Sequence, residues 1–225
     1  MATKLCGVIF DWRGTLVVTP PEVEWCREAL SRLGRRSDHD SAAELLSRIE
    51  RAPGIERLSA SGVDASAAGH RLAYFSVFRD AGLDQDLAAS LYAVESDFRF
   101  NPFAADAAQT LVEINEMGLR IAILSDIHFD IRPAFAEAGL IDLVDSFVLS
   151  FEVGLMKPDL AFFDACLRDI GLAAVETLMV GDRAAYDGAA VAVGCPVLLL
   201  PPLSRVEDRR LSLVTGIVRG SNGLR

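Results

Sequence analysis

The sequence predicts an α/β fold, a doubly wound parallel sheet with an all-helical segment inserted after its first strand. Strand-like and helix-like segments alternate from residue 105 to residue 200, the pattern of a parallel sheet with helices on both faces. One more buried strand is expected at residues 5–10. It is separated from the others because the intervening residues 22–99 carry apolar side chains at helical spacing without a strand signal.

The first strand and the helical block follow from local composition. Residues 5–10 are a short apolar run with β-branched side chains, which is typical of a buried parallel strand. After Pro20 and Pro21 the apolar spacing becomes helical, and Pro102 stops the last helix of the block. The expected helices are residues 22–33, 40–51, 64–80 and 84–99.

The remaining elements alternate in type. We expect helices at residues 105–117, 130–138, 159–170 and 184–193, and strands at residues 119–124, 146–150, 177–181 and 196–200. Residues 203–225 are expected to add a short helix or strand and then a loose, polar, Gly-rich tail. This organisation predicts a core formed by residues 1–18 and 103–225, and a helical cap formed by residues 19–102.

Composition narrows the classes of partner. The chain has 225 residues, of which 51% are hydrophobic and 24% charged, as in ordinary folded proteins. Its net charge of −10 argues against nucleic acid or an anionic membrane as the main partner. The N-terminal apolar run is too short for a signal peptide, and no stretch reaches the ~18 apolar residues of a membrane span, so we expect a cytoplasmic protein.

Polar residues with chemical potential follow the expected strands. Asp11 ends the first strand and is followed by Gly14 and Thr15, and Ser125 ends the strand at residues 119–124. Asp182 ends the strand at residues 177–181, and Asp187 stands five residues later. The carboxyl ends of the strands are where open α/β sheets bind their ligands. We therefore expect these side chains to meet at one edge of the sheet.

Lys157 completes the set, in the segment Gly-Leu-Met-Lys-Pro-Asp. The chain has only two lysines, Lys4 and Lys157, and an ammonium group here would offset the charge of gathered carboxylates and a phosphate. Together, these segments resemble the four motifs of the haloacid dehalogenase (HAD) superfamily of hydrolases, over Val8 to about Gly194.

The resemblance implies a Rossmann-like core, an inserted helical cap and a set of catalytic residues. Asp11 would be the nucleophile that attacks phosphorus and forms an aspartyl-phosphate, and Ser125 and Lys157 would stabilise the transferred phosphoryl group. The cofactor implied is Mg²⁺, held by Asp11, Asp182 and the backbone carbonyl of Arg13. Asp187 would act through water or steady the loop.

Arg13 departs from the family pattern. Phosphatases of the superfamily carry a second Asp at this position, which protonates the leaving group and then activates water. A guanidinium with a pKa above ~12 does neither at neutral pH. Asp126 and His128, which follow Ser125, are possible auxiliary groups for this proton transfer.

Three functions stay open on sequence alone. The leading one is an Mg²⁺-dependent phosphohydrolase acting on a small phosphorylated, anionic metabolite. The second is a catalytically impaired regulatory protein that binds metal and phosphate, with Arg13 forming a salt bridge to Asp11 that disables it. The third is a metal-free, dehalogenase-like hydrolase, against which the retained Asp182 argues.

Overall fold

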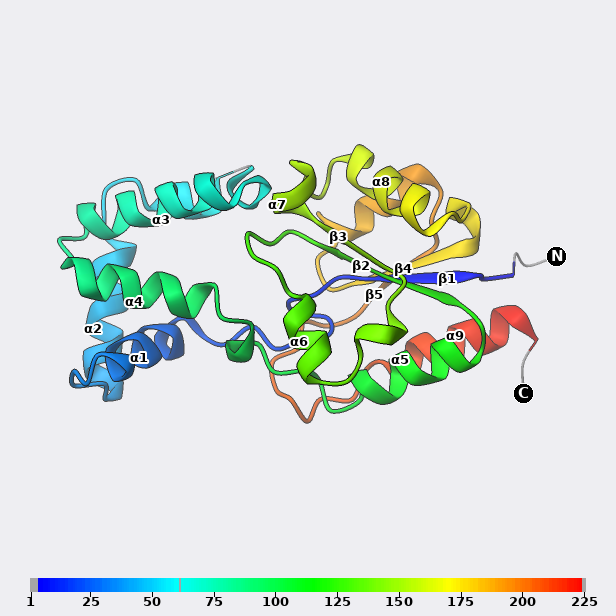
Figure 1. The fold of residues 1–225 in the computed structure, drawn as a ribbon, viewed down its shortest axis with the longest axis horizontal. Helices are drawn as coiled ribbons and strands as arrows, with labels where there is room; N and C mark the ends of the chain where they lie inside the picture. Colours follow the sequence, from blue (N-terminus) through cyan, green and yellow to red (C-terminus); the bar gives the residue numbers. More distant parts are fainter. Residues whose placement is uncertain (1–3, 61, 224–225) are drawn as a thin grey trace.

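The protein is described by a computed structural model covering residues 4–60 and 62–223. One parallel sheet has the strand order β3-β2-β1-β4-β5 (Figure 1). The strands are β1 (Gly7–Phe10), β2 (Arg120–Ser125), β3 (Ser146–Leu149), β4 (Thr177–Gly181) and β5 (Val197–Leu199). The doubly wound α/β prediction is confirmed. Because β1 pairs with both β2 and β4, the order of connection reverses at β1, which is the ligand-binding point of such sheets.

Helices cover both faces of this sheet. The α-helices are α1 (Glu22–Arg32), α2 (His39–Glu50), α3 (Ala67–Asp80), α4 (Gln85–Glu95), α5 (Ala107–Glu116), α6 (Arg132–Glu137), α7 (Ser150–Val153), α8 (Leu160–Ile170) and α9 (Ser212–Asn222). In Figure 1, α8 lies on one side of the sheet, and α5 and α9 lie side by side on the other.

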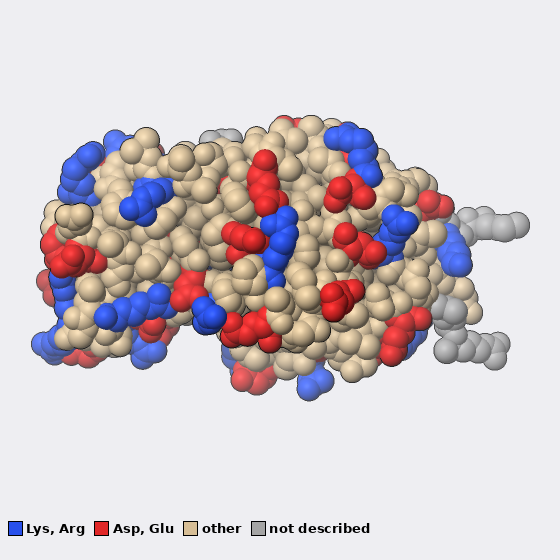
Figure 2. Space-filling model, viewed as in Figure 1, with Lys and Arg blue, Asp and Glu red and all other residues tan. Residues whose placement is uncertain are grey.

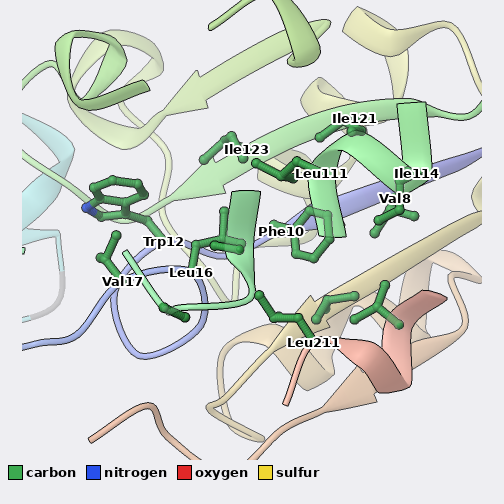
Figure 3. Close-up of a cluster of buried hydrophobic side chains, with 14 of the residues drawn as sticks. Val8, Phe10, Trp12, Leu16, Val17, Leu111, Ile114, Ile121, Ile123 and Leu211 are labelled. Atoms are coloured by element: carbon green, nitrogen blue, oxygen red, sulfur yellow. The ribbon is translucent and has the colours of Figure 1, made fainter. Parts of the chain in front are cut away.

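The strands alternate their side chains between two cores, as a period of two requires. Val8 and Phe10 of β1 point to the face covered by α5 and α9, where they pack with Leu111 (Figure 3). Ile9 points to the other face and packs with Phe162 and Phe163 of α8. Burial on both faces fixes the register of β1, because a shift by one residue would exchange the two sets of side chains.

Helices α1 to α4 form a separate group with its own apolar core, at the left of Figure 1. Trp25 of α1 packs on Tyr74 and Phe78 of α3. The two segments that join this group to the sheet run together, since the Val18 amide donates to the Pro102 carbonyl at 2.9 Å. The division into a core (1–18 and 103–225) and a cap (19–102) stays a prediction that agrees with this arrangement, and we call 19–102 the cap segment.

Several boundaries differ from the sequence prediction. Helix α3 begins at Ala67 rather than residue 64, because the Ser66 hydroxyl accepts from the Gly69 amide and caps it. The segment 184–193 forms a 3₁₀ helix, η6 (Asp187–Val193), rather than an α-helix. The remaining 3₁₀ helices are η1 (Ile55–Ser59), η2 (Val63–Ala65), η3 (Phe98–Phe100), η4 (Ile141–Leu143) and η5 (Ala174–Glu176).

The short helix expected within residues 203–225 is α9, which extends to Asn222 and so takes up residues that were expected to form a loose tail. Residues Ser212–Asn222 form α9, which buries Val214 and Val218 against the α5 face of the sheet. The Asn222 amide group donates to the Leu5 carbonyl at 2.9 Å and connects the helix end to the segment just before β1. The last two residues of the expected tail, 224–225, lie outside the described residues.

The surface carries the charged side chains that the composition of the chain leads one to expect. On the face shown in Figure 2, acidic and basic side chains are interspersed. In the described part of the chain, no helix has the length and apolar character needed to cross a bilayer. The four cysteines are free thiols.

Candidate active site

The polar residues predicted from the motifs meet at the carboxyl edge of the sheet. Asp11 follows β1, Ser125 is the last residue of β2 and Asp182 follows β4, so three adjacent strands deliver them to one place. A cavity of about 1090 Å³ opens there and is lined by Asp11, Ser125 and Asp182, with Lys157 from the loop before α8.

Lys157 is buried and sits between two carboxylates. Its Nζ donates to Asp11 Oδ1 and lies 2.7 Å from Asp187 Oδ1. Burial alone lowers the pKa of Lys157, but the carboxylates of Asp11, Asp187 and Asp126 outweigh it and raise that pKa above its ordinary value. The ammonium group is therefore charged and fixes the orientation of the Asp11 carboxylate.

Asp187 holds the loop that carries Asp182. Its Oδ2 accepts from the backbone amides of Asp182 at 3.1 Å and Arg183 at 2.9 Å, while Oδ1 faces Lys157. A Cβ at Gly181 would collide with the Asp187 side chain, which explains the glycine at this position. Both Asp187 oxygens are engaged, an arrangement suited to steadying the loop.

The carboxylates form a donor set that fits Mg²⁺. One oxygen each from Asp11, Asp182 and Asp187 lie within 4.8 Å of one another. Burial, together with the like charges of Asp11 and Asp187, raises the pKa of Asp182 to about 6. Hard oxygen ligands gathered at a partly buried point are what Mg²⁺ binds, and a cation there would relieve their repulsion.

Thr15 belongs to the same group, although sequence reasoning gave it no role. Its hydroxyl lies 3.4 Å from Asp11 Oδ2 and 3.5 Å from Asp182 Oδ1. The signal was present in the Gly-Thr pair that follows Asp11, and the buried position of Thr15 is what reveals its contact.

Arg13 does not pair with Asp11, so the salt bridge expected for an impaired protein is not formed. The guanidinium turns toward the cap segment, where Nη1 lies 2.7 Å from Glu95 Oε1 and Nη2 donates to the Glu95 carbonyl at 3.0 Å. Nη2 and Nε also lie 3.4 Å from Asn101 Oδ1. Arg13 thus connects the loop after β1 to the end of α4.

The two possible auxiliary groups have different surroundings. Asp126 lines the cavity, accepts from the Lys157 amide at 2.9 Å and lies 3.4 Å from Arg183 Nη2. Burial raises the pKa of Asp126. His128 turns away and packs under the cap segment, with Nε2 3.0 Å from Ser96 Oγ. Arg183, a cavity residue that the sequence reasoning missed, is stacked on Tyr186.

Comparisons with known proteins show the family to which the chain belongs. Residues 7–194 match the sequence profile of the haloacid dehalogenase-like hydrolases. A ribulose-1,5-bisphosphate 5-phosphatase from Halopiger xanaduensis is 32% identical over 217 residues, which cover 87% of this chain and 84% of that protein.

Solved structures show the same fold. A HAD phosphatase from Thermococcus onnurineus has 20% identity and a TM-score of 0.63, covering 96% of this chain and 99% of that one. A 2-haloacid dehalogenase from Pseudomonas syringae pv. Tomato has 22% identity and a TM-score of 0.66, with the same coverages of 96% and 99%. The profile match extends over most of the chain, and the protein belongs to the haloacid dehalogenase-like hydrolase family.

Proposed function

We propose that this hydrolase is an Mg²⁺-dependent phosphohydrolase that acts on a small phosphorylated metabolite through an aspartyl-phosphate. The observation that carries the proposal is the buried Asp11 carboxylate, which Lys157 orients in the lining of a cavity that Asp182 also lines. A fixed carboxylate is a nucleophile once it faces an electrophilic phosphorus.

Each residue then has a role in phosphoryl transfer. Asp11 Oδ2, the oxygen not held by Lys157, would attack phosphorus. Lys157 and the Ser125 hydroxyl would stabilise the phosphoryl oxygens by charge and by hydrogen bonding. Asp11, Asp182 and the Arg13 carbonyl would hold Mg²⁺, which supplies further charge stabilisation when bound.

The cavity indicates the size and charge of the substrate, and the Halopiger relative indicates its chemical class. The volume of about 1090 Å³ accommodates a sugar phosphate, and Arg13 and Arg183 add positive charge to its lining. The Halopiger relative is named for ribulose-1,5-bisphosphate, so phosphorylated sugars are the first substrates to test.

Hydrolysis of an aryl phosphate in the presence of Mg²⁺ tests the reaction class. The wild-type chain should release phosphate, and Asp11→Asn should lower the rate by at least ~10³-fold because the nucleophile is lost. Asp130→Asn, at an exposed aspartate beyond β2, is the matched control and should keep the wild-type rate. Equal activity in Asp11→Asn would rule out this proposal.

Arg13 supports a second candidate, a protein that accepts a phosphoryl group and releases it very slowly. Arg13 occupies the position of the usual general acid and base and is held by Glu95. Loss of such a group typically costs ~10²–10⁴ in rate. In that case the aspartyl-phosphate would form and persist, and the protein would serve as a phosphorylation-dependent regulator.

A further inference from the structure

Two buried histidines and a partly exposed aspartate form a cluster where the cap segment meets the rest of the chain, residues 1–18 and 103–225, which we call the sheet domain. His70 belongs to α3, Asp64 to η2, and His128 to the loop after β2. The two imidazole rings are stacked, with centroids 3.4 Å apart and planes 7° apart. Both histidines are at most 3% exposed. Asp64 also lines the large cavity.

The distances in this cluster are longer than those of hydrogen bonds. Asp64 Oδ1 lies 3.6 Å from His70 Nε2 and 3.5 Å from His128 Nδ1, against ~2.7–3.2 Å for an N–H···O bond. Among the described residues, His128 Nδ1 has no hydrogen-bond partner although it is buried. Two ligand atoms that are each about 2.1 Å from a tetrahedral ion lie about 3.4 Å apart, which is close to the spacing observed.

The outer nitrogens of both rings have partners of their own. His70 Nδ1 lies 3.3 Å from the Tyr92 hydroxyl, and His128 Nε2 lies 3.0 Å from Ser96 Oγ. In the tautomer in which each outer nitrogen donates to its hydroxyl oxygen, the inner nitrogen keeps a free lone pair on the side of Asp64. This is how metal-ligating histidines are commonly supported.

The chemistry of the three side chains selects the class of cation. His70 and His128 each offer an imidazole nitrogen and Asp64 a carboxylate oxygen, and these ligand atoms all lie within 4.8 Å of one another. The positive charge of the Arg13 guanidinium also reaches Asp64. That charge is offset by Glu95, whose Oε1 lies 2.7 Å from Arg13 Nη1. Two imidazole nitrogens and one carboxylate oxygen suit Zn²⁺, Co²⁺ or Ni²⁺, whereas Mg²⁺ prefers oxygen ligands.

The geometry points to a transition-metal site, of the class that binds Zn²⁺, formed by Asp64, His70 and His128 and separate from the carboxylate site at Asp11. Binding requires the stacked rings to splay so that both inner nitrogens face the ion. His70 and Asp64 come from the cap segment and His128 does not, so the ion would cross-link the cap segment to the sheet domain. The site does not depend on the proposed function, because its ligands differ from the proposed catalytic residues.

Metal titration of the full, tag-free chain tests the site. After removal of metals by a chelator, Co²⁺ should bind with one equivalent giving the visible absorption bands of a low-symmetry, nitrogen-ligated ion. This signal should persist in Asp182→Asn, which disables the carboxylate site. His70→Asn and His128→Asn should weaken binding by more than the ~10–100-fold that loss of an outer partner costs. His39→Asn alters the third histidine, which is exposed, and should bind as the wild type does.

A measurement on the wild-type chain covers the case in which the buried variants do not fold. In a long-range ¹H–¹⁵N correlation spectrum, one equivalent of Zn²⁺ should shift the inner nitrogens of His70 and His128 and leave His39 unchanged. Unchanged His70 and His128 signals at one equivalent would overturn the site. So would Co²⁺ bands that survive in folded His70→Asn and His128→Asn, or that disappear in Asp182→Asn alone.

Discussion

At the scale of single residues, the candidate active site concentrates negative charge around one buried lysine. Asp11 and Asp187 both contact Lys157, while Asp182 has no cationic side chain within ion-pair distance among the described residues. Burial of this carboxylate, and then repulsion by Asp11 and Asp187, raise its pKa to about 6. A bound divalent ion would remove that repulsion.

The raised pKa of Asp182 predicts a pH dependence of Mg²⁺ binding. The folded metal-free protein holds a proton on Asp182 below about pH 6, whereas an unfolded chain releases it near 3.8. Since Mg²⁺ needs the carboxylate, its Kd should rise by about tenfold per pH unit below pH 6 and level off above pH 7. Calorimetric titration from pH 5 to 8, in two buffers of different ionisation enthalpy, measures both the Kd and the proton released.

The raised pKa of Asp182 also predicts how the stability of the metal-free protein depends on pH, and this dependence serves as a control. Ionised Asp182 costs the metal-free fold stability, a cost that develops as the pH rises from its unfolded pKa through about 6. Asp182→Asn should therefore raise the thermal midpoint of the metal-free protein at pH 7 and leave it unchanged at pH 3. A Kd for Mg²⁺ that is constant from pH 5 to 8 would contradict this account.

At the scale of elements, the turn after β1 brings the backbone close to the loop after β4. Gly14 has φ +79°, and a Cβ there would stand 2.5 Å from Asp182 Oδ2. Only glycine combines this backbone conformation with this approach. The turn is thus shaped by the carboxylate that it faces.

Gly14→Ala tests both constraints on this turn, which are the left-handed backbone at residue 14 and the close approach to Asp182. The left-handed backbone costs about 1 kcal/mol for a residue with a Cβ, and displacement of Asp182 should also weaken Mg²⁺ binding by at least ~10-fold. Gly34→Ala is the matched control, because Gly34 has φ +64° with nothing within 4 Å. It should lose stability by urea unfolding but bind Mg²⁺ normally. Equal Mg²⁺ affinity in both variants would show that the approach to Asp182 is unimportant.

Most elements could be predicted because their signals are local. The run at residues 5–10 and the alternation after residue 105 fix the order of strands and helices, and the strand ends place Asp11, Ser125 and Asp182 together. Helix α9 extends further than the sequence predicts, because burial against α5 stabilises residues whose glycines suggested a loose tail. Tertiary packing of this kind outweighs local propensity.

The directions of side chains in the site were less predictable. The pattern placed Arg13 near Asp11, but Glu95 is 82 residues away in sequence and only the fold brings the two together. In the same way, His128 follows a strand that ends at the cavity, yet the cap segment draws it into a stack with His70. Long-range contacts decide such orientations, and no spacing within a motif encodes them.

At the scale of the whole molecule, polar contacts that differ in their exposure to solvent hold the cap segment beside the cavity. The Arg13–Glu95 pair is half-buried, with side-chain exposures of 27% and 18%, and Asn101 adds further contacts. The Arg99–Glu137 pair also joins this region to α6, but its exposures are 64% and 58%.

Glu95→Ala should therefore destabilise the protein more than Glu137→Ala. The first change leaves a partly buried guanidinium without its carboxylate and should cost about 2 kcal/mol of unfolding free energy. The second removes an exposed pair and should cost less than ~0.5 kcal/mol. Urea unfolding of both variants gives the comparison, and equal losses would mean that the Arg13 contact does not fasten the cap segment.

We expect Asp11 to take the phosphoryl group although Arg13 cannot activate water. Mass spectrometry after acid quenching of a reaction with Mg²⁺ and a small phosphoryl donor tests it most directly. One phosphoryl group should be added to the peptide that contains Asp11, and it should decay faster in Arg13→Asp, where a group able to act as acid and base is restored. Steady turnover in the wild type with no adduct on that peptide, at any time sampled, would contradict it.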